Sequence, residues 1–430
     1  MTSSTSTDTG PRQSPFGIAN RGPLEGLIVL DFTTQKAGPL ATYFLAAMGA
    51  TVIKIEEPKG GDAVRGYAPF IGPDGIVTMW RQHPDAMSVP ILNRARGKHS
   101  VTLNLKTPQG LSVYRAMVSR ADIVMENYAS GTADRLGIGY EATRAINPRI
   151  IYCSVSGFGA GVMPGRKALD VVIQASSGMM LASGEEGGPP IRIGMSIADS
   201  VAPLFAVMGI NAALYRRQMT GRGEYVDISM LGALTAFLAS EEWQALERIG
   251  EPTRTGNCNV KATPFGVFRC RDGHIAIGAG SRDHFAHALF RIMGRPEWVD
   301  DPRYATLSAR CPRNDEITGA VDAWCNERSV DEIESELMKV GIPVARVRSP
   351  AEALDDPLLE QSGDVTSITH PDLGTIPGLK TFGLPIRFHD AEYGTGSAAP
   401  RLGEHNELVY RDWLGLDEEQ LRAWKALGVF

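Results

Sequence analysis

Asp199 is the only acidic residue between Glu186 and Glu224, and it lies in a long apolar segment. The one other charged residue of the segment 191–214 (IRIGMSIADSVAPLFAVMGINAAL) is Arg192. A carboxylate in apolar surroundings loses hydration energy unless hydrogen bonds or a ligand compensate the loss. The simplest interpretation is that Asp199 caps the helix that follows it, because Asp is favoured at that position. The alternative is that the carboxylate takes part in chemistry.

Histidine is absent from the region around Asp199. None of the eight histidines lies between residues 100 and 273; they are His83, His99, His274, His284, His287, His370, His389 and His405. A mechanism in this region must therefore work without imidazole, and carboxylates remain as the candidates. They are Asp199 and Asp170, which lies in KALDVVIQASSG. Asp170 is also well placed to cap the helix predicted to begin at VVIQASSG.

Basic residues and glycine turns gather near the ends of predicted strands. The loop TTQKAGPL (33–40) contains Gly38-Pro39, which opens a helix whose N–H groups can face an anion. The nearby cations are Lys54, Lys59, Arg65, Arg94, Arg96, Lys98 and Lys106. Each of them alone is typical of a solvated face. Together they favour a ligand that carries several phosphates.

Several familiar site motifs are missing from the chain. The run Gly157-Phe158-Gly159-Ala160-Gly161 lacks the GxGxxG spacing of a dinucleotide site, and the sequence contains no Walker lysine motif, HExxH or GxSxG. Its five cysteines are odd in number and show no CxxC spacing, which indicates neither a disulfide framework nor a zinc site. We therefore expect no metal.

Short apolar runs rich in β-branched residues alternate with helical patterns along the first half of the chain. Runs at 26–32, 51–56, 100–105, 122–127 and 149–156 are apolar enough to be strands buried on both faces. A helix is predicted over 107–121, with Thr107 as its N-cap and Pro108 as its first residue. This alternation predicts an α/β fold with a doubly wound parallel sheet.

The pattern changes after Gly223. A strand at 224–229 and a long helix from 230 to about 248 precede a link at 251–265. A hairpin at 266–280 with an Asp-Gly turn and helices near 282–294 and 329–340 follow, and an amphipathic helix is predicted near 417–427. We predict a disordered arm at 1–22, a large domain whose first part is 23–223, a small α+β domain at 224–340, and a C-terminal part at 341–430.

The composition narrows the class of protein. The chain of 430 residues is long enough for more than one core, and its 43% apolar and 21% charged content is that of a globular protein. A net charge of −6 argues against a nucleic-acid partner. We find no apolar run of membrane-spanning length and no signal-peptide pattern, so we expect a cytoplasmic protein with no membrane partner.

A series of segments resembles the class III CoA-transferases, the family of formyl-CoA transferase and carnitine CoA-transferase. The segments are GPLEGLIVLDFT, AGP, ATVIKIE, GGDAVRG, SVTLNLKTPQG, ADIVMENYASGTADRLGI, NPRIIYCSVSGFG, the Asp199 segment, TGRGEYVDIS, RLGEHNELV and the final LGVF. They follow one another at the spacings of that family and cover residues 22 to 430. Each segment is weak alone, but the combination is specific.

The resemblance implies an interlocked homodimer with a Rossmann-like large domain built from both ends of the chain and a small central domain. A heteromer is the alternative assembly. Asp199 matches the family's nucleophilic aspartate. The resemblance places contacts to coenzyme A at Lys36, Ala37, Leu103, Lys106, Asn127, Tyr128, Ala129, Arg135 and Lys167.

Three features depart from formyl-CoA transferase. Lys36 stands where that enzyme has glutamine, Glu57 stands where it has arginine, and its glycine-run loop has no counterpart around 255–265. These differences count against formyl-CoA and oxalate as the substrates.

The resemblance implies that CoA moves from an acyl-CoA thioester to a carboxylic acid through a mixed anhydride on Asp199, with no tightly bound cofactor. One alternative is an α-methylacyl-CoA racemase, because Asp170 matches the catalytic aspartate of that enzyme. The histidine gap removes the second base that such proton exchange needs. A further alternative is a non-catalytic CoA-binding subunit of a heteromeric transferase.

Overall fold

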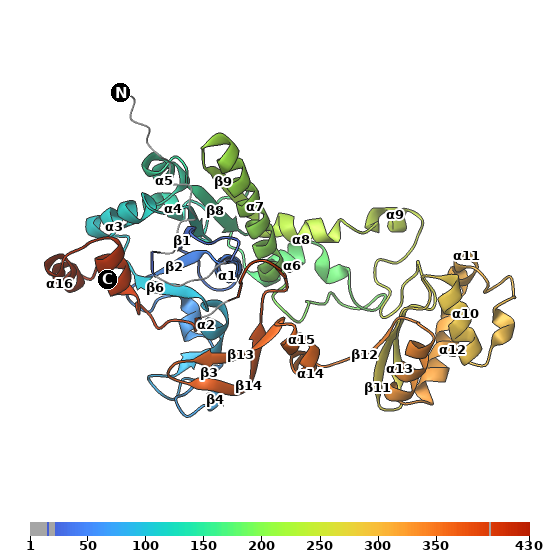
Figure 1. The fold of residues 1–430 in the computed structure, drawn as a ribbon. Helices are drawn as coiled ribbons and strands as arrows, with labels where there is room; N and C mark the ends of the chain where they lie inside the picture. Colours follow the sequence, from blue (N-terminus) through green and yellow to red (C-terminus); the bar gives the residue numbers. More distant parts are fainter. Residues whose placement is uncertain (1–14, 17–21, 395–396) are drawn as a thin grey trace, which may run out of the picture. The chain divides into compact units, whose positions relative to one another are not determined.

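The computed structural model describes residues 15–16, 22–394 and 397–430, and these form two compact units (Figure 1). The first unit contains the chain up to Ser177, Gly194–Phe237 and Leu354–Phe430, and the second contains Gly178–Ile193 and Leu238–Ala353. Almost all of the predicted arm at 1–22 lies outside the described residues. The domain limits predicted at residues 223 and 340 stay a prediction.

The first unit contains a six-stranded parallel sheet. Its strands are β1 (Ile28–Asp31), β2 (Thr51–Glu56), β6 (Lys98–Thr102), β7 (Ile123–Glu126), β8 (Ile151–Ser156) and β9 (Glu224–Ser229). They lie in the order β6-β2-β1-β7-β8-β9. Counted along the chain within this sheet, that is the 3-2-1-4-5-6 order of doubly wound folds. The predicted α/β class with a parallel sheet is confirmed.

The first five sheet strands fall where the sequence predicts them, within a few residues at each end. The strand predicted at 224–229 is also confirmed as an element, although the predicted small domain at 224–340 includes it. In the structure β9 pairs with β8 over its whole length, from Ile151–Glu224 to Ser156–Ser229. Residue order along the chain does not reveal this pairing, because a crossover of about seventy residues separates the two strands.

The helices of the first unit connect the strands and pack on one another. Helix α1 packs against α7, and α3 packs against α5. The helices are α1 (Ala37–Ala47), α2 (Val89–Arg94), α3 (Pro108–Val118), α4 (Thr132–Arg135), α5 (Tyr140–Ile146), α6 (Asp170–Ser176), α7 (Ala198–Thr220), α15 (Pro357–Gln361) and α16 (Glu418–Ala426), with α8 (Met230–Leu238) leading out of the unit. Helix α14 (Pro350–Leu354) belongs to the second unit except for its last residue. Thr107 caps α3 and accepts a hydrogen bond from the Gly110 N–H, as predicted.

Two small sheets complete the first unit. One contains β4 (Val77–Thr78), β3 (Phe70–Ile71) and β5 (Met87–Ser88), and the other contains β13 (Val365–His370) and β14 (Gly374–Phe382). The end of the chain closes the main core. Tyr410 is fully buried and donates through its hydroxyl to the Thr102 carbonyl, and the Val429 carbonyl accepts from the Asn104 N–H. Both ends of the chain therefore build one core.

The second unit has its own core and its own sheet. Strands β10 (Gly266–Cys270), β11 (Gly273–Ile277) and β12 (Val344–Arg346) are antiparallel, and the predicted hairpin is confirmed. Its helices are α9 (Trp243–Arg248), α10 (Asp283–Ile292), α11 (Leu307–Arg310), α12 (Asn314–Asn326) and α13 (Val330–Lys339). Helices α10 and α13 lie where they are predicted.

The single long helix predicted from 230 to 248 is wrong. The structure has two helices there, α8 and α9, with a break between Leu238 and Trp243. The Trp243 indole N–H donates to the Leu238 carbonyl at 2.7 Å, so a side chain satisfies a carbonyl at the helix end.

Two lysines of the parallel sheet, Lys54 of β2 and Lys98 of β6, are buried in ion pairs. Lys98 Nζ lies 3.0 Å from Asp31 Oδ2, and Lys54 Nζ lies 2.8 Å from Asp62 Oδ2. Arg65 forms a two-point pair with Glu56. The sequence predicts these three cations as candidate phosphate ligands, and in the structure they are instead paired with carboxylates of the fold.

We expect Lys98→Met to lower the free energy of unfolding by about 3 to 5 kcal/mol, because it leaves the fully buried Asp31 without its cation. Urea denaturation at pH 7 measures the effect. Lys59→Met is the matched control, since Lys59 is exposed, and it should change stability by less than about 0.5 kcal/mol. Equal stability losses in the two variants would contradict the structural role of the pair.

Candidate active site

A cavity lies at the carboxyl ends of β1, β7 and β8. Strands β1 and β7 are neighbours, and the chain order reverses between them, which is where doubly wound sheets bind ligands. The cavity has a volume of about 430 Å³ and is lined by the loops that follow these strands, by residues 163–170, and by Asp199 and Met230. All of these residues belong to the first unit.

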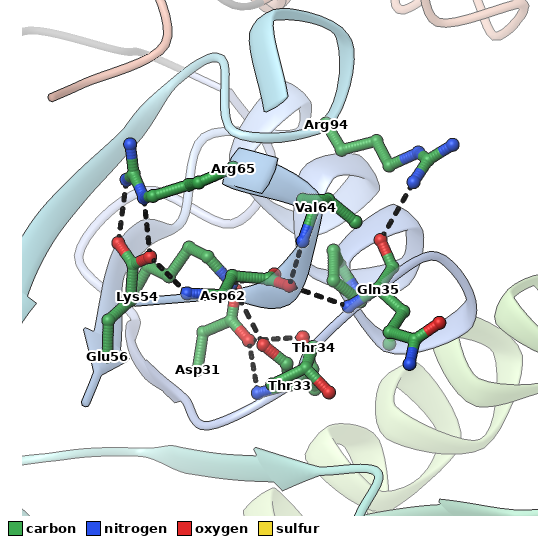
Figure 2. Close-up of polar contacts among 12 residues, drawn as sticks. Asp31, Thr33, Thr34, Gln35, Lys54, Glu56, Asp62, Val64, Arg65 and Arg94 are labelled. Atoms are coloured by element: carbon green, nitrogen blue, oxygen red, sulfur yellow. Dashed lines mark hydrogen bonds and ion pairs between the residues drawn. The ribbon is translucent and has the colours of Figure 1, made fainter. Parts of the chain in front are cut away.

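The loop between β1 and α1 forms one wall of the cavity and is held in an unusual conformation. Gln35 has a φ of 67°, and among the described residues it is the one non-glycine with positive φ. Such a conformation costs energy and persists only when surrounding contacts enforce it. Three contacts do so here (Figure 2): the Gln35 N–H donates to Asp62 Oδ1 at 3.0 Å, and its carbonyl accepts from Arg94 Nη1 at 2.9 Å. Lys54 Nζ donates to the Thr33 carbonyl at 2.9 Å.

Asn127 holds the same loop from the side of β7. Its Oδ1 accepts from the Thr34 N–H at 2.8 Å, and its Nδ2 donates to the Thr34 carbonyl at 2.9 Å. Helix α1 then starts in close contact with the loop. A Cβ at Gly38 would lie 2.3 Å from the Thr33 Cβ, so only glycine allows this approach. The loop before α1 is therefore held by contacts from Asp62, Arg94 and Asn127.

Lys36 connects this loop to the start of α7. It is half-buried, and its Nζ donates to the Ser196 carbonyl at 3.1 Å. Burial lowers the pKa of Lys36, while Asp199 and Asp170 act in the opposite direction. Lys36 thus places a positive charge next to the first turn of α7.

The start of α7 is capped by Asp170, from 28 residues earlier in the chain. Asp170 Oδ1 accepts from the Ala198 N–H at 2.8 Å and from the Asp199 N–H at 3.4 Å. Its Oδ2 accepts from Gln174 Nε2 at 2.6 Å, and that Nε2 also donates to the Met195 carbonyl. Both oxygens of Asp170 are therefore used to position α7.

Both capping predictions are wrong in detail. The residue before α7 is Ile197 and the residue before α6 is Leu169, and neither Asp199 nor Asp170 caps its own helix. Asp170 is the first residue of α6, and it reaches across to cap α7 instead. Capping preferences describe local bonds, and this bond is long-range.

The Asp199 carboxylate is the group that remains free. Within the described part of the chain it accepts no hydrogen bond and forms no ion pair, although it is half-buried. Burial and the neighbouring Asp170 raise the pKa of Asp199 to about 6, while Lys36 and Arg94 oppose the rise. At pH 7 the carboxylate is mostly ionised, poorly solvated and exposed to a cavity, as a nucleophile should be.

Most of the residues predicted to contact coenzyme A line a cavity. The main cavity is lined by Lys36, Ala37, Asn127, Tyr128, Ala129 and Lys167. A second cavity of about 220 Å³ is lined by Leu103, Lys106 and, again, Tyr128. Arg135 is the exception: it is exposed on α4, donates to the Thr132 hydroxyl and lies outside the described lining of both cavities.

Gln174 and Arg166 have polar side chains near the cavity and are not among the site residues that the sequence predicts. Gln174 orients Asp170, and its signal was the spacing of four residues that places the two side chains on one face of α6. Arg166 lines the cavity beside Lys167, and its guanidinium lies 4.5 Å from the centre of the Phe158 ring. The adjacent pair Arg166-Lys167 was the available signal for a basic rim.

The model of CoA-transferase family III matches residues 24–406. The chain belongs to this family. A formyl-CoA:oxalate CoA-transferase of Streptomyces avermitilis is 34% identical over 428 residues, which cover 94% of this chain and 99% of the relative. A succinyl-CoA–D-citramalate CoA-transferase of Chloroflexus aurantiacus is 33% identical over 409 residues, covering 94% and 97%.

A solved structure supports the same assignment. The crystal structure of a CAIB/BAIF family protein from Brucella suis superposes with a TM-score of 0.78 at 31% identity, covering 91% of this chain and 100% of that one. The protein is a CoA-transferase, and its substrates are an acyl-CoA thioester and a carboxylic acid. The recognition of the family from its motifs is confirmed.

Helix α7 of this family III CoA-transferase is long and apolar enough to cross a membrane by length and composition alone. The packing of α7 explains its apolar composition, because one face of the helix lies against α1, β8 and β9. Near its end the buried Arg217 pairs with Asp122 at 3.1 Å. Its other face exposes Leu204, Met208, Tyr215 and Met219.

We expect Asp199→Asn to raise the free energy of unfolding by about 1 to 3 kcal/mol above pH 6, because it removes a half-buried charge that lacks a partner. The pKa of Asp199 in the fold is about 6, above its ordinary value of 3.8, so ionisation lowers stability as the pH rises between these values. The gain should vanish near pH 3.8, where the carboxyl is protonated in the fold. Urea titrations at several pH values measure it, and a gain independent of pH would contradict the raised pKa.

Proposed function

We propose that Asp199 carries the acyl group and then the coenzyme while CoA moves between two acids. In the first step its carboxylate attacks the thioester carbonyl, the C–S bond breaks, and CoA leaves as a thiolate. The product is a mixed anhydride between Asp199 and the acyl group. The thiolate then attacks the aspartyl carbonyl of the anhydride, which releases the donor acid and leaves an aspartyl-CoA thioester.

The acceptor acid completes the transfer by the reverse sequence. Its carboxylate attacks the aspartyl thioester, forms a second anhydride and releases the CoA thiolate. The thiolate attacks the acceptor's carbonyl in that anhydride, so that a new acyl-CoA leaves and the Asp199 carboxylate is restored. Only a carboxylate side chain can form these anhydrides, so asparagine should not replace Asp199. The observation that carries the proposal is the free, half-buried carboxylate at the cavity wall.

Two features support stabilisation of the tetrahedral oxyanions. Lys36 lies within electrostatic reach of Asp199 and leaves two of its three N–H donors available after bonding Ser196. The start of α1 also lines the cavity at Ala37, and the first N–H groups of a helix have no partner within the helix. Together they direct positive potential at the place where negative charge develops.

Coenzyme A should occupy the two cavities that share Tyr128. The main cavity next to Asp199 suits the thioester end, with Arg166 and Lys167 at its exposed rim. The smaller cavity at Leu103 and Lys106 suits the nucleotide end. Arg135 would contact coenzyme A only if its exposed side chain moved toward the cavities.

The assembly that fits this proposal is a homodimer. The exposed apolar side chains of α7, at Leu204, Met208, Tyr215 and Met219, form a face that a second copy would cover. The interlocked form and the cytoplasmic location stay predictions from the resemblance and the sequence.

The racemase alternative receives no support from the site. It requires two bases on opposite sides of an α-carbon. Asp170 uses both of its oxygens to hold α7 and Gln174, and no histidine is among the described residues that line the cavity. A second base is therefore missing where the reaction would need it.

We expect Asp199→Asn and Asp199→Ala to lower CoA transfer by at least about 10⁴-fold, as losses of catalytic nucleophiles do. Mass spectrometry of the products from an acyl-CoA and an acid measures the transfer, and circular dichroism shows that the fold is kept. With the wild type, hydroxylamine added during turnover should convert Asp199 to its hydroxamate and inactivate the enzyme. Transfer by Asp199→Asn near the wild-type rate, or an unmodified Asp199 peptide, would overturn the proposal.

We expect Asp170→Asn to move the acidic limb of the pH–rate profile to lower pH. Burial and the Asp170 charge raise the pKa of Asp199 to about 6, and the rate should fall as the pH drops through that value and the nucleophile becomes protonated. Asparagine keeps an oxygen that can accept from the Ala198 N–H but removes the charge. A limb that stays in place, measured as kcat/KM for the acyl-CoA between pH 4.5 and 8, would contradict coupling between the two carboxylates.

A further inference from the structure

We propose that Val162 and Met163, on the loop between β8 and α6, close over the acylated Asp199 and exclude water from it. These two side chains thereby determine that the acyl group is transferred and not hydrolysed. The inference rests on the proposed anhydride at Asp199. It adds to that proposal the residues that set the choice between an acid and water.

The proposed anhydride is sensitive to water. Water that attacks the acyl carbonyl breaks the bond to the Asp199 oxygen, and the products are the free acid, the Asp199 carboxylate and two protons. The CoA thiolate takes up one of these protons, so the net result is hydrolysis of the acyl-CoA to acid, free CoA thiol and one proton. Closed active sites prevent such losses by expelling water. Here the cavity is open on one side, since Met163 and Leu169 line it and are 41% and 62% exposed.

One segment of the cavity wall, 161–168, is not bonded to the rest of the fold. The loop before α1 and the start of α7 are both held by hydrogen bonds from distant residues. By contrast, the hydrogen bonds of 161–168 within the described chain are internal: the Arg166 N–H donates to the Met163 carbonyl, and Arg166 Nη1 donates to the Met163 sulfur, each at 3.2 Å. This segment can therefore move without breaking hydrogen bonds to other elements.

The two ends of this loop are anchored and lie close together. The Gly157 carbonyl accepts from the Leu231 N–H at 2.9 Å, and the Ala160 N–H donates to Asp227 Oδ2 at 2.8 Å. A Cβ at Gly157 would lie 2.1 Å from the Ala168 Cβ, so the ends of the loop meet where the residue is glycine. A surface loop whose ends meet is an Ω-loop, and such a loop can swing as a unit about its ends.

Gly161 and Gly165 give the loop two flexible points. Their φ angles are 72° and 79°, and a Cβ at either position would meet no atom within 4 Å. Glycine enters and leaves such a conformation at small cost. Between the two glycines lie Val162 and Met163, and Val162 is 66% exposed. Closure over the cavity removes these apolar side chains from water, which stabilises the closed form.

Two cations of the loop make its closure depend on bound coenzyme A. Arg166 and Lys167 line the cavity, and within the described residues neither forms an ion pair. The Arg166 guanidinium instead lies 4.5 Å from the centre of the Phe158 ring, at the start of the same loop. The phosphates of acyl-CoA attract both cations and draw the loop over the cavity. The loop is therefore open in the free enzyme and closed in the acyl-CoA complex.

The first experiment measures closure of the loop in the full-length enzyme, with coenzyme A itself as the probe. We expect saturating CoA to slow hydrogen exchange of the amides in 161–165 by about 10-fold, which corresponds to a closed population of roughly 90%. Trypsin cleavage after Arg166 and Lys167 should slow as well. Calorimetry shows that CoA is bound. Unchanged exchange of 161–165 in the CoA complex would overturn the closure, whereas a lack of CoA binding would overturn the proposed function.

The second experiment measures the choice between acid and water. Acetyl-CoA and succinyl-CoA are each incubated with their own ¹³C-labelled acid; labelled acyl-CoA reports transfer and free CoA thiol reports hydrolysis. We expect the double variant Val162→Ser/Met163→Ser to raise the ratio of hydrolysis to transfer by about 10-fold, because serine weakens the apolar contacts of the closed form. A merely structural defect would lower both rates and leave the ratio unchanged.

Two controls accompany the double variant. Val162→Ile/Met163→Leu keeps the apolar surface and should keep the wild-type ratio. Leu358→Ser changes an exposed leucine of α15 outside the described lining of both cavities, and it should also leave the ratio unchanged. A wild-type ratio in Val162→Ser/Met163→Ser would overturn this inference. Transfer that survives Asp199→Asn would instead overturn the proposed function on which it rests.

Discussion

The rest of the site depends on the conformation of the five residues between β1 and α1. Gln35 adopts a left-handed backbone there, and Asp62, Asn127 and Arg94 hold its loop through hydrogen bonds to the backbone. Asp62 can do this because its other oxygen is neutralised by the buried Lys54. An ion pair within the fold thus fixes the backbone of the cavity wall, and the cavity keeps its shape before any ligand binds.

The two carboxylates near the cavity, Asp170 and Asp199, differ in their hydrogen bonds and therefore in their roles. Asp170 accepts hydrogen bonds from the start of α7 and from Gln174, so its charge is well compensated. Asp199 receives none of these bonds and instead lines the cavity, where the charges of Lys36 and Arg94 lower its pKa in opposition to burial and Asp170. The first carboxylate stabilises the helix that carries the second, and it also raises the pKa of that second carboxylate. One residue, Asp170, therefore both positions Asp199 and raises its pKa.

The cations of the first unit divide in a similar way. Lys54, Lys98 and Arg65 form ion pairs with carboxylates inside the fold, because a buried charge without a partner would lower stability. Lys36 and Arg94 donate to backbone carbonyls and form no ion pair with a carboxylate of the described chain. Burial alone does not separate structural from functional cations here, because all five are at least half-buried. The kind of partner separates them.

The sequence by itself determined the family, the parallel sheet and the nucleophile candidate, and most of the contact residues that it predicted line one of the two cavities. These follow from local patterns: buried strands are continuous apolar runs, and an isolated Asp in an apolar segment requires a reason. Only the tertiary structure decided that β9 joins the sheet, that Asp170 caps α7 rather than α6, and that Lys54 and Lys98 are buried in ion pairs. Each of these depends on contacts between residues far apart in the chain. Neither residue type nor spacing reports which distant group a side chain will meet, since that is set by how the strands and helices pack.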